Sequence, residues 1–180
     1  MDILITPRLT LRPPAWPDAH DIADGLSNWD VARMLAVVPA PYFTRDAKDW
    51  IEQVSARPDA LVYTIHRERL IGVVSIEGDG PEPRLGYWLN ERAQGQGYMT
   101  EAATALIGHA FGKRKLAGIA SSVFIDNPAS MRVQQKLGFR QTGISQSFSR
   151  ARDTMVDTLM TRLDAAHWHN RNAAEIRAAA

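Results

Sequence analysis

The segment from residue 92 to residue 101 reads Arg-Ala-Gln-Gly-Gln-Gly-Tyr-Met-Thr-Glu, and its composition suits the binding of an anion. It joins an apolar segment ending near Leu89 to a run of apolar residues with helical spacing. The N-terminus of a helix carries unpaired N–H groups and a partial positive charge. Gly95 and Gly97 would let backbone amides approach phosphate oxygens without Cβ clashes. The segment therefore indicates a site for a phosphate-bearing ligand, with a simple tight turn as the alternative.

The glycine spacing differs from that of two other phosphate-binding loops. A dinucleotide-binding fingerprint needs Gly-x-Gly-x-x-Gly after the first strand, and a P-loop needs Gly-Lys-Ser/Thr. Neither pattern occurs here. Arg92-x-x-Gly95-x-Gly97, followed by Thr-Glu-Ala, instead resembles the acetyl-CoA pyrophosphate motif of the GNAT superfamily of N-acetyltransferases.

A second element supports the same resemblance. Asn127-Pro128-Ala129-Ser130 and the later Lys136-Leu137-Gly138-Phe139 resemble the Asn-x-x-Ser element of that family and its closing sequence. An asparagine side chain can bond a pantetheine amide, and a hydroxyl can reach the thioester sulfur. Ser130 is therefore a candidate general acid. The alternative is that Asn127 starts a turn with Pro128 and that Ser130 caps a helix.

A third element, Leu85-Gly86-Tyr87-Trp88-Leu89, resembles the strand that splays from its neighbour to admit pantetheine. With Thr6–Pro13 included, the match covers nearly the whole chain and is nearest to the ribosomal-protein N-terminal acetyltransferases. The resemblance implies a set of residues that contact acetyl-CoA: Trp88, Leu89, Arg92, Gln94, Gly95, Gln96, Gly97, Tyr98, Met99, Thr100, Asn127 and Ser130.

The general base is the least defined part of the site. Relatives often carry an acid immediately before the Leu-Gly-Tyr sequence, where this chain has Arg84. Glu82 lies two residues earlier, so an Arg84–Glu82 pair would lower the pKa of the glutamate and weaken it as a base. Glu77 is the other candidate, with a solvated strand edge as the alternative. The family implies direct transfer without an acetyl-enzyme, which agrees with the absence of cysteine.

The elements that must position these residues follow from hydrophobic periodicity. We expect a mixed α/β (α+β) fold with six to seven mostly antiparallel strands, a central β-α-β cofactor unit and flanking helices. Thr44 is expected to cap one of the helices, and Gly138 to end another in a left-handed conformation. The expected strands are Leu9–Arg12, Leu61–His66, Leu70–Ile76, Arg84–Leu89, Ile119–Ile125, Phe139–Ser147 and Thr154–Leu163, and the expected helices begin at Asp18, Asn28, Thr44, Met99 and Ser130.

Composition limits the remaining possibilities. The chain has 180 residues, 45% hydrophobic and 23% charged, with a net charge of +1 and no cysteine. These values suit one domain over residues 1–180, with a helical or frayed tail from about residue 165. They give no reason to expect nucleic acid or membrane partners. His167 and His169 would diverge on a helix, so we expect no metal. No signal pattern precedes the domain, and we expect a cytoplasmic monomer or homodimer.

The sequence thus predicts an acetyl-CoA-dependent N-acetyltransferase acting on a primary amine, such as the N-terminal α-amine of a protein. One alternative is a small-amine acetyltransferase acting on an antibiotic or a polyamine. Another is a GNAT-fold protein that binds acetyl-CoA without turnover, since a fold alone does not prove function. The identity of the amine acceptor stays open at this point.

Overall fold

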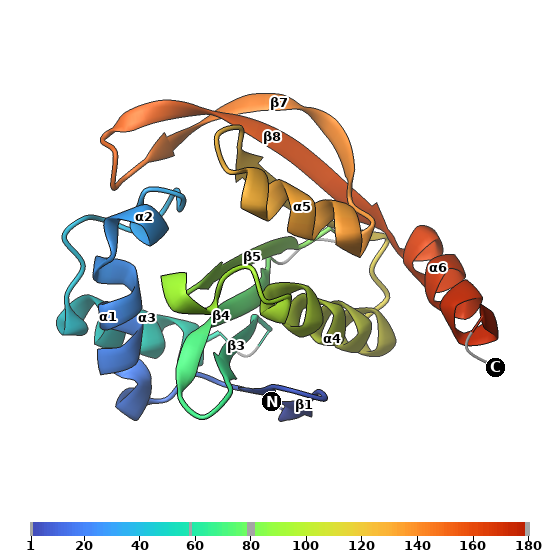
Figure 1. Ribbon diagram of the computed structural model, residues 1–180, viewed down its shortest axis with the longest axis horizontal. Helices are drawn as coiled ribbons and strands as arrows, with labels where there is room; N and C mark the ends of the chain where they lie inside the picture. Colours follow the sequence, from blue (N-terminus) through green and yellow to red (C-terminus); the bar gives the residue numbers. More distant parts are fainter. Residues whose placement is uncertain (1, 58, 79–81, 179–180) are drawn as a thin grey trace.

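An eight-stranded sheet runs through the molecule in the order β1-β2-β3-β4-β5-β6-β8-β7 (Figure 1). The computed structural model describes residues 2–57, 59–78 and 82–178. All neighbouring strands are antiparallel except β5 and β6, which are parallel. The strands are β1 (Leu4–Ile5), β2 (Thr10–Arg12), β3 (Leu61–His66), β4 (Leu70–Glu77), β5 (Arg84–Leu89), β6 (Gly118–Phe124), β7 (Arg140–Ser149) and β8 (Thr154–Asp164).

The sheet contains one strand more than the upper end of the expected range. The additional strand is β1, in which Leu4 and Ile5 pair with Leu11 and Thr10 of β2. A two-residue strand is too short to show an alternating pattern, so periodicity could not reveal it. The mixed, mostly antiparallel class and the seven other strands are confirmed.

Helices cover both faces of this sheet. On β4, Val74 and Ile76 join the core beneath α4, whereas Val73 packs with Val54 of α3 on the opposite face. This division follows from the alternation of side chains along a strand. The helical segments are η1 (Trp16–Asp18), α1 (Ala19–Ser27), α2 (Trp29–Ala32), α3 (Thr44–Ser55), η2 (Glu91–Ala93), α4 (Tyr98–Lys113), α5 (Pro128–Leu137) and α6 (Ala165–Ala178).

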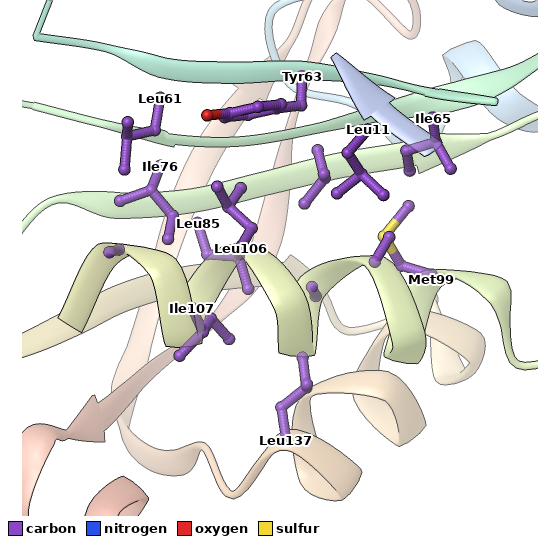
Figure 2. Packing of buried hydrophobic residues seen from close by; sticks show 14 of the residues in the cluster. Leu11, Leu61, Tyr63, Ile65, Ile76, Leu85, Met99, Leu106, Ile107 and Leu137 are labelled. Atoms are coloured by element: carbon purple, nitrogen blue, oxygen red, sulfur yellow. The ribbon is translucent and has the colours of Figure 1, made fainter. Parts of the chain in front are cut away.

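The apolar stripe of α4 fixes that helix against the sheet. Met99, Leu106 and Ile107 are at most 4% exposed. Leu106 points toward Ile76 of the sheet, and Ile107 lies on the other side of α4, toward Leu137 (Figure 2). Burying side chains of this size contributes about 1.5–3 kcal/mol each. The start of α4, where the anion-binding segment lies, is therefore held rigidly relative to the sheet.

Two helix starts can be compared with their predictions. Asn28 caps α2 as expected, since its Oδ1 accepts a hydrogen bond from the Asp30 N–H at 2.8 Å. The prediction that Thr44 caps α3 is wrong. Phe43 occupies the N-cap, and the Asp46 carboxylate at the third helical position accepts the Phe43 N–H at 2.7 Å, so the helix begins one residue earlier without a hydroxyl cap.

The tail forms helix α6 and packs on the body of the molecule through Trp168, which is 6% exposed. Its indole ring lies 6.2 Å from the ring of Phe111 at the end of α4. Within the described residues, no helix is long and apolar enough to cross a membrane. No group of three metal-ligating side chains is present in that same part of the chain.

Candidate active site

A separation of two parallel strands creates a large cleft. β5 and β6 pair only at Arg84–Ala120 and Leu85–Ser121, and beyond Ser121 β6 pairs with β8 alone. At the last paired position the Ser121 hydroxyl donates to the carbonyl of Leu85 at 2.9 Å. A cleft of about 1530 Å³ occupies this region, bounded by the remainder of β5, the start of α4 and the start of α5.

The loop before α4 has the backbone that its glycines predict. Gly95 and Gly97 have φ angles of 75° and 81°, in the left-handed region that other residues adopt at a cost. Gly97 is the N-cap of α4, so the helix begins at Tyr98. Both glycines line the cleft. The unpaired amides of the first helical turn therefore form a cradle of the kind that binds phosphate groups.

The N-terminal segment fastens this loop to its helix. Arg8 donates from Nε to Glu101 Oε2 at 2.6 Å and from Nη1 to the Gln96 carbonyl at 3.1 Å. Glu101 also accepts from the Thr6 hydroxyl at 2.6 Å and from the Arg8 N–H at 2.9 Å. These bonds offset the burial of Glu101 and lower the pKa of its carboxyl group. The sequence of Thr6–Pro13 contributed only to the family resemblance. It did not predict that this segment would hold the loop before α4.

Most of the residues expected to contact acetyl-CoA lie on the cleft. The structure places Arg92 and Gln96 elsewhere, on the exposed side of the loop. The Gln96 side chain donates to the Arg92 carbonyl at 2.8 Å, which stabilises the loop from behind. The residues that do line the cleft are Trp88, Leu89, Gln94, Gly95, Gly97, Tyr98, Met99, Thr100, Asn127 and Ser130.

Asn127 is the N-cap of α5. Its Oδ1 accepts a hydrogen bond from the Ser130 N–H at 3.0 Å. The capping role that the alternative interpretation gave to Ser130 therefore belongs to Asn127. The Nδ2 group of Asn127 makes no hydrogen bond to any residue that the structure describes, so it is free to donate into the cleft.

Ser130 has a partner that the sequence did not predict. The hydroxyls of Tyr87 and Ser130 lie 2.7 Å apart, and Tyr87 Oη is 3.2 Å from the Ser130 carbonyl. Burial raises the pKa of Tyr87, which outweighs the opposing effect of its hydrogen bonds. Tyr87 therefore stays protonated near neutral pH. Its alternation with Leu85 and Leu89 toward the α4 face was visible in the sequence and could have identified it.

A buried polar network holds α5 against the sheet behind this pair. Gln134 donates to the Ser121 hydroxyl at 3.0 Å and accepts from Thr161 at 2.7 Å. Gln134 is 2% exposed and Ser121 is 1% exposed. Satisfied buried networks give a unique geometry because an unpaired member would be costly. The position of Ser130 relative to Tyr87 is fixed by this contact of α5 with β6 and β8.

The two candidate bases are engaged elsewhere. Glu77 lies on the cleft, but it pairs with Arg57 at 2.5 Å. The expected Arg84–Glu82 pair is wrong: Glu82 accepts two hydrogen bonds from Arg162, at 2.8 and 3.0 Å, and these lower the pKa of its carboxyl group. Arg84 instead donates to the hydroxyl of Ser122 on the parallel strand β6 at 2.9 Å, while Glu82 is held by Arg162.

The tip of the β7–β8 hairpin closes one side of the cleft, above α2 in Figure 1. The Arg150 N–H donates to the Ala36 carbonyl at 2.9 Å. Arg152 donates to the Arg33 carbonyl at 2.6 Å and to Asp126 at 2.7 Å. These contacts connect the hairpin, the segment after α2 and the loop before α5.

Known proteins with similar sequences belong to one family. Residues 8–140 match the family model described as an acetyltransferase (GNAT) domain. The N-acetyltransferase p20 of Bacillus licheniformis, itself uncharacterised, is 26% identical over 171 residues, 91% of this chain and 96% of that protein. The ribosomal-protein-serine acetyltransferase of Escherichia coli K12 is 34% identical over 109 residues, 55% of this chain and 61% of that protein.

The fold agrees with the same relatives. RimL, a ribosomal L7/L12 α-N-protein acetyltransferase whose structure was solved in complex with coenzyme A, superposes with a TM-score of 0.80 at 21% identity. The superposition covers 92% of this chain and 99% of RimL. The resemblance to the ribosomal-protein acetyltransferase subgroup is therefore confirmed at the level of sequence and fold.

Proposed function

We propose that this chain, which belongs to the acetyltransferase (GNAT) family, transfers an acetyl group from acetyl-CoA directly to a primary amine. The observation that carries the proposal is the Tyr87–Ser130 hydroxyl pair, 2.7 Å apart, on the cleft where β5 and β6 separate. The family model establishes the acetyltransferase class. The direct route and the acceptor are the parts that we propose.

The cradle before α4 suits the pyrophosphate of acetyl-CoA. Positive φ angles at Gly95 and Gly97 expose backbone amides, and the helix dipole adds a partial positive charge. The edge of β5 beyond Leu85 is open to the pantetheine amides because β6 has turned away, although the Leu89 carbonyl already accepts from the Gln94 side chain at 3.2 Å. Bound there, acetyl-CoA would supply the activated acetyl thioester.

Ser130 and Tyr87 serve the departure of the thiol. Transfer forms an N–C bond and breaks a C–S bond, so one proton must reach the leaving sulfur. Tyr87 can donate to the Ser130 carbonyl while Ser130 donates to Tyr87 Oη, and rotation of either hydroxyl would turn a proton toward the sulfur. The two hydroxyls thus form a donor pair in which each member orients the other.

Removal of the proton from the amine depends less on protein side chains than protonation of the leaving thiol does. Glu77 and Glu82 are held by Arg57 and Arg162, so neither is poised as a base. A neutral amine is already a good nucleophile, and water in the open cleft can take its proton. We propose that the enzyme positions the amine and leaves its deprotonation to solvent.

The acceptor that we favour is the N-terminal α-amine of a protein, because relatives named for ribosomal-protein acetylation match in both sequence and fold. A small amine is the second candidate, supported by the closure of the cleft by Arg150 and Arg152 on one side. Cytoplasmic location, a monomeric or dimeric state, the absence of a metal and a single domain over residues 1–180 stay predictions.

Release of free CoA from acetyl-CoA, measured across a panel of peptides and small amines, tests this function. We expect turnover with at least one primary amine and none with the same compound after N-acetylation. Acetyl-CoA should also raise the melting temperature, by the equivalent of about 2.7 kcal/mol at a hundredfold excess over Kd. NAD should not. A thermal shift with acetyl-CoA but no turnover on any amine would favour the non-catalytic alternative.

A further inference from the structure

The cleft extends through the gap between β5 and β6 to the opposite face of the sheet. Leu85 and Tyr87 line it from the α4 side, and Gly86 and Trp88 line it from the α3 side. Ser75 of β4 continues the second wall, and a Cβ on Gly86 would lie 3.4 Å from its hydroxyl. The acceptor can therefore reach the site from the α3 side, away from the phosphate cradle.

Helix α3 presents an acidic face to this end of the cleft. Asp46, Asp49, Trp50 and Gln53 line it, with the i, i+3, i+4, i+7 spacing of one helix face. Asp46 accepts the Phe43 N–H through Oδ2, which leaves Oδ1 facing outward with Arg45 3.8 Å away. Asp49 makes no hydrogen bond or ion pair with any residue that the structure describes.

Nearby cations are occupied by other partners. Arg57 pairs with Glu77 at 2.5 Å. The guanidinium of Arg45 lies 5.0 Å from the ring centroid of Phe43, and the ammonium of Lys48 lies 5.5 Å from that of Trp16. Arg45 also lies 3.8 Å from Asp46 and partly offsets that charge, but none of these three cations contacts Asp49.

A buried tyrosine gives an independent sign of a ligand here. Tyr42 lines the same end of the cleft and is 8% exposed. Its hydroxyl has no hydrogen-bond partner among the described residues. Burial, followed by the charges of Asp46 and Asp49, raises the pKa of Tyr42 to about 12. Although most of the side chain is buried, the hydroxyl itself keeps access to the cleft, so this phenol is available to a molecule there.

We propose that this end of the cleft binds a second positive charge of the acceptor, an ammonium or guanidinium group separate from the amine that is acetylated. Asp46 and Asp49 attract the charge, the Tyr42 hydroxyl gives a neutral hydrogen-bonding partner, and the half-buried Trp50 indole offers a cation-binding face. The inference rests on the proposed function, since it specifies which primary amines this site accepts.

The decisive measurement compares a diaminoalkane with the monoamine of equal chain length. Wild type should have the higher kcat/KM for the diamine. Asp49→Asn should reduce that preference by about threefold and Asp46→Asn/Asp49→Asn by about tenfold, as expected for exposed charges. The asparagine at 46 keeps an oxygen for the Phe43 N–H. Glu52→Gln, an equal charge change on the exposed side of α3, should leave the preference intact.

A binding arm separates failure of this inference from failure of the proposed function. In calorimetric titrations of the CoA complex, Asp49→Asn and Tyr42→Phe should weaken diamine binding and leave monoamine binding unchanged. This result would support the charge site even if no amine were acetylated. Equal effects on diamine and monoamine, or no effect on either, would overturn it.

A peptide pair distinguishes the two sources of the second charge. The peptides differ only by lysine or glutamine close to the N-terminus. A lysine preference that Asp49→Asn removes would identify a peptide acceptor. A preference confined to the diamine would identify a small polyamine.

Discussion

The donor role that we propose for the Tyr87 and Ser130 hydroxyls would make catalysis depend on two residues from different elements. Ser130→Ala should lower kcat roughly tenfold to a hundredfold and leave acetyl-CoA affinity nearly unchanged, because proton donation matters only as the thiolate leaves. Tyr87→Phe should act in the same direction. Steady-state kinetics with the chemical step rate-limiting, together with calorimetric titration of acetyl-CoA, measures both effects.

The double variant shows whether the two hydroxyls form a unit. If each orients the other, the loss in the double variant should be much smaller than the product of the single losses. Wild-type turnover by Ser130→Ala would instead assign the donor role to Tyr87 alone or to water. A full multiplicative loss would contradict the shared role.

Asn127 caps α5, and two substitutions can separate this structural role from the acetyl-CoA-binding role that we propose for it. Asn127→Ala removes the cap on the Ser130 N–H and should cost about 1 kcal/mol of stability, besides raising the KM for acetyl-CoA. Asn127→Asp keeps the capping oxygen and removes the Nδ2 donor. It should therefore retain stability and still raise this KM. An unchanged KM in Asn127→Asp would leave Asn127 as a cap only.

Single residues could be predicted from the sequence where the backbone conformation requires one residue type. Gly95 and Gly97 were identifiable because glycine tolerates positive φ. The Tyr87–Ser130 contact spans 43 positions in sequence and depends on how α5 packs, which no local pattern encodes. The choice of Arg162 over Arg84 as the partner of Glu82 is likewise a tertiary result.

At the scale of elements, the start of α4 depends on a single backbone conformation. A Cβ at Gly97 would meet only Arg8 Nη2, at 3.5 Å, so the cost of a side chain there arises from φ of 81° rather than from crowding. Gly97→Val should weaken acetyl-CoA binding strongly because a β-branched residue resists this conformation. Calorimetric titration checks the loss of affinity, alongside the melting temperature.

Gly97→Asn is the matched control for that loop, since asparagine adopts the left-handed conformation more readily. It should retain more of the affinity than Gly97→Val. Equal affinities of Gly97→Val and wild type would remove this loop from the phosphate site.

The sequence predicted helices and strands correctly where the hydrophobic periodicity extends over many residues. The α4 stripe and the β3–β4 hairpin are long segments, and both were placed correctly. Helix α3 begins one residue earlier than predicted, because the Asp46 carboxylate fixes the N–H of the Phe43 cap and no hydroxyl at the cap is needed for this bond. Strand β1 escaped detection for its length alone.

At the scale of the whole molecule, Arg152 joins three segments that are distant in sequence. It contacts the carbonyl of Arg33 after α2 and the carboxylate of Asp126 before α5, and it lies itself in the β7–β8 turn. Its guanidinium is also 5.1 Å from the ring centroid of Phe124. This connection stabilises the closed side of the cleft, so its loss should affect global stability and acceptor binding together.

The Asp126–Arg152 pair also gives this stability a pH dependence with a definite sign. The hydrogen bond from Arg152 lowers the pKa of Asp126 below its ordinary value. A carboxyl group with a depressed folded-state pKa binds fewer protons when folded, so its stabilising contribution is present above the unfolded pKa. That contribution is lost as the pH falls through the folded-state value.

Because Asp126 is 47% exposed, we expect the ion pair to contribute no more than about 1 kcal/mol of stability at neutral pH. Urea unfolding of wild type and Asp126→Asn should therefore differ at pH 7 and converge as the pH falls below 3.8. A difference that persists unchanged into acid would show that the stabilisation comes from packing of the loop rather than from the ion pair.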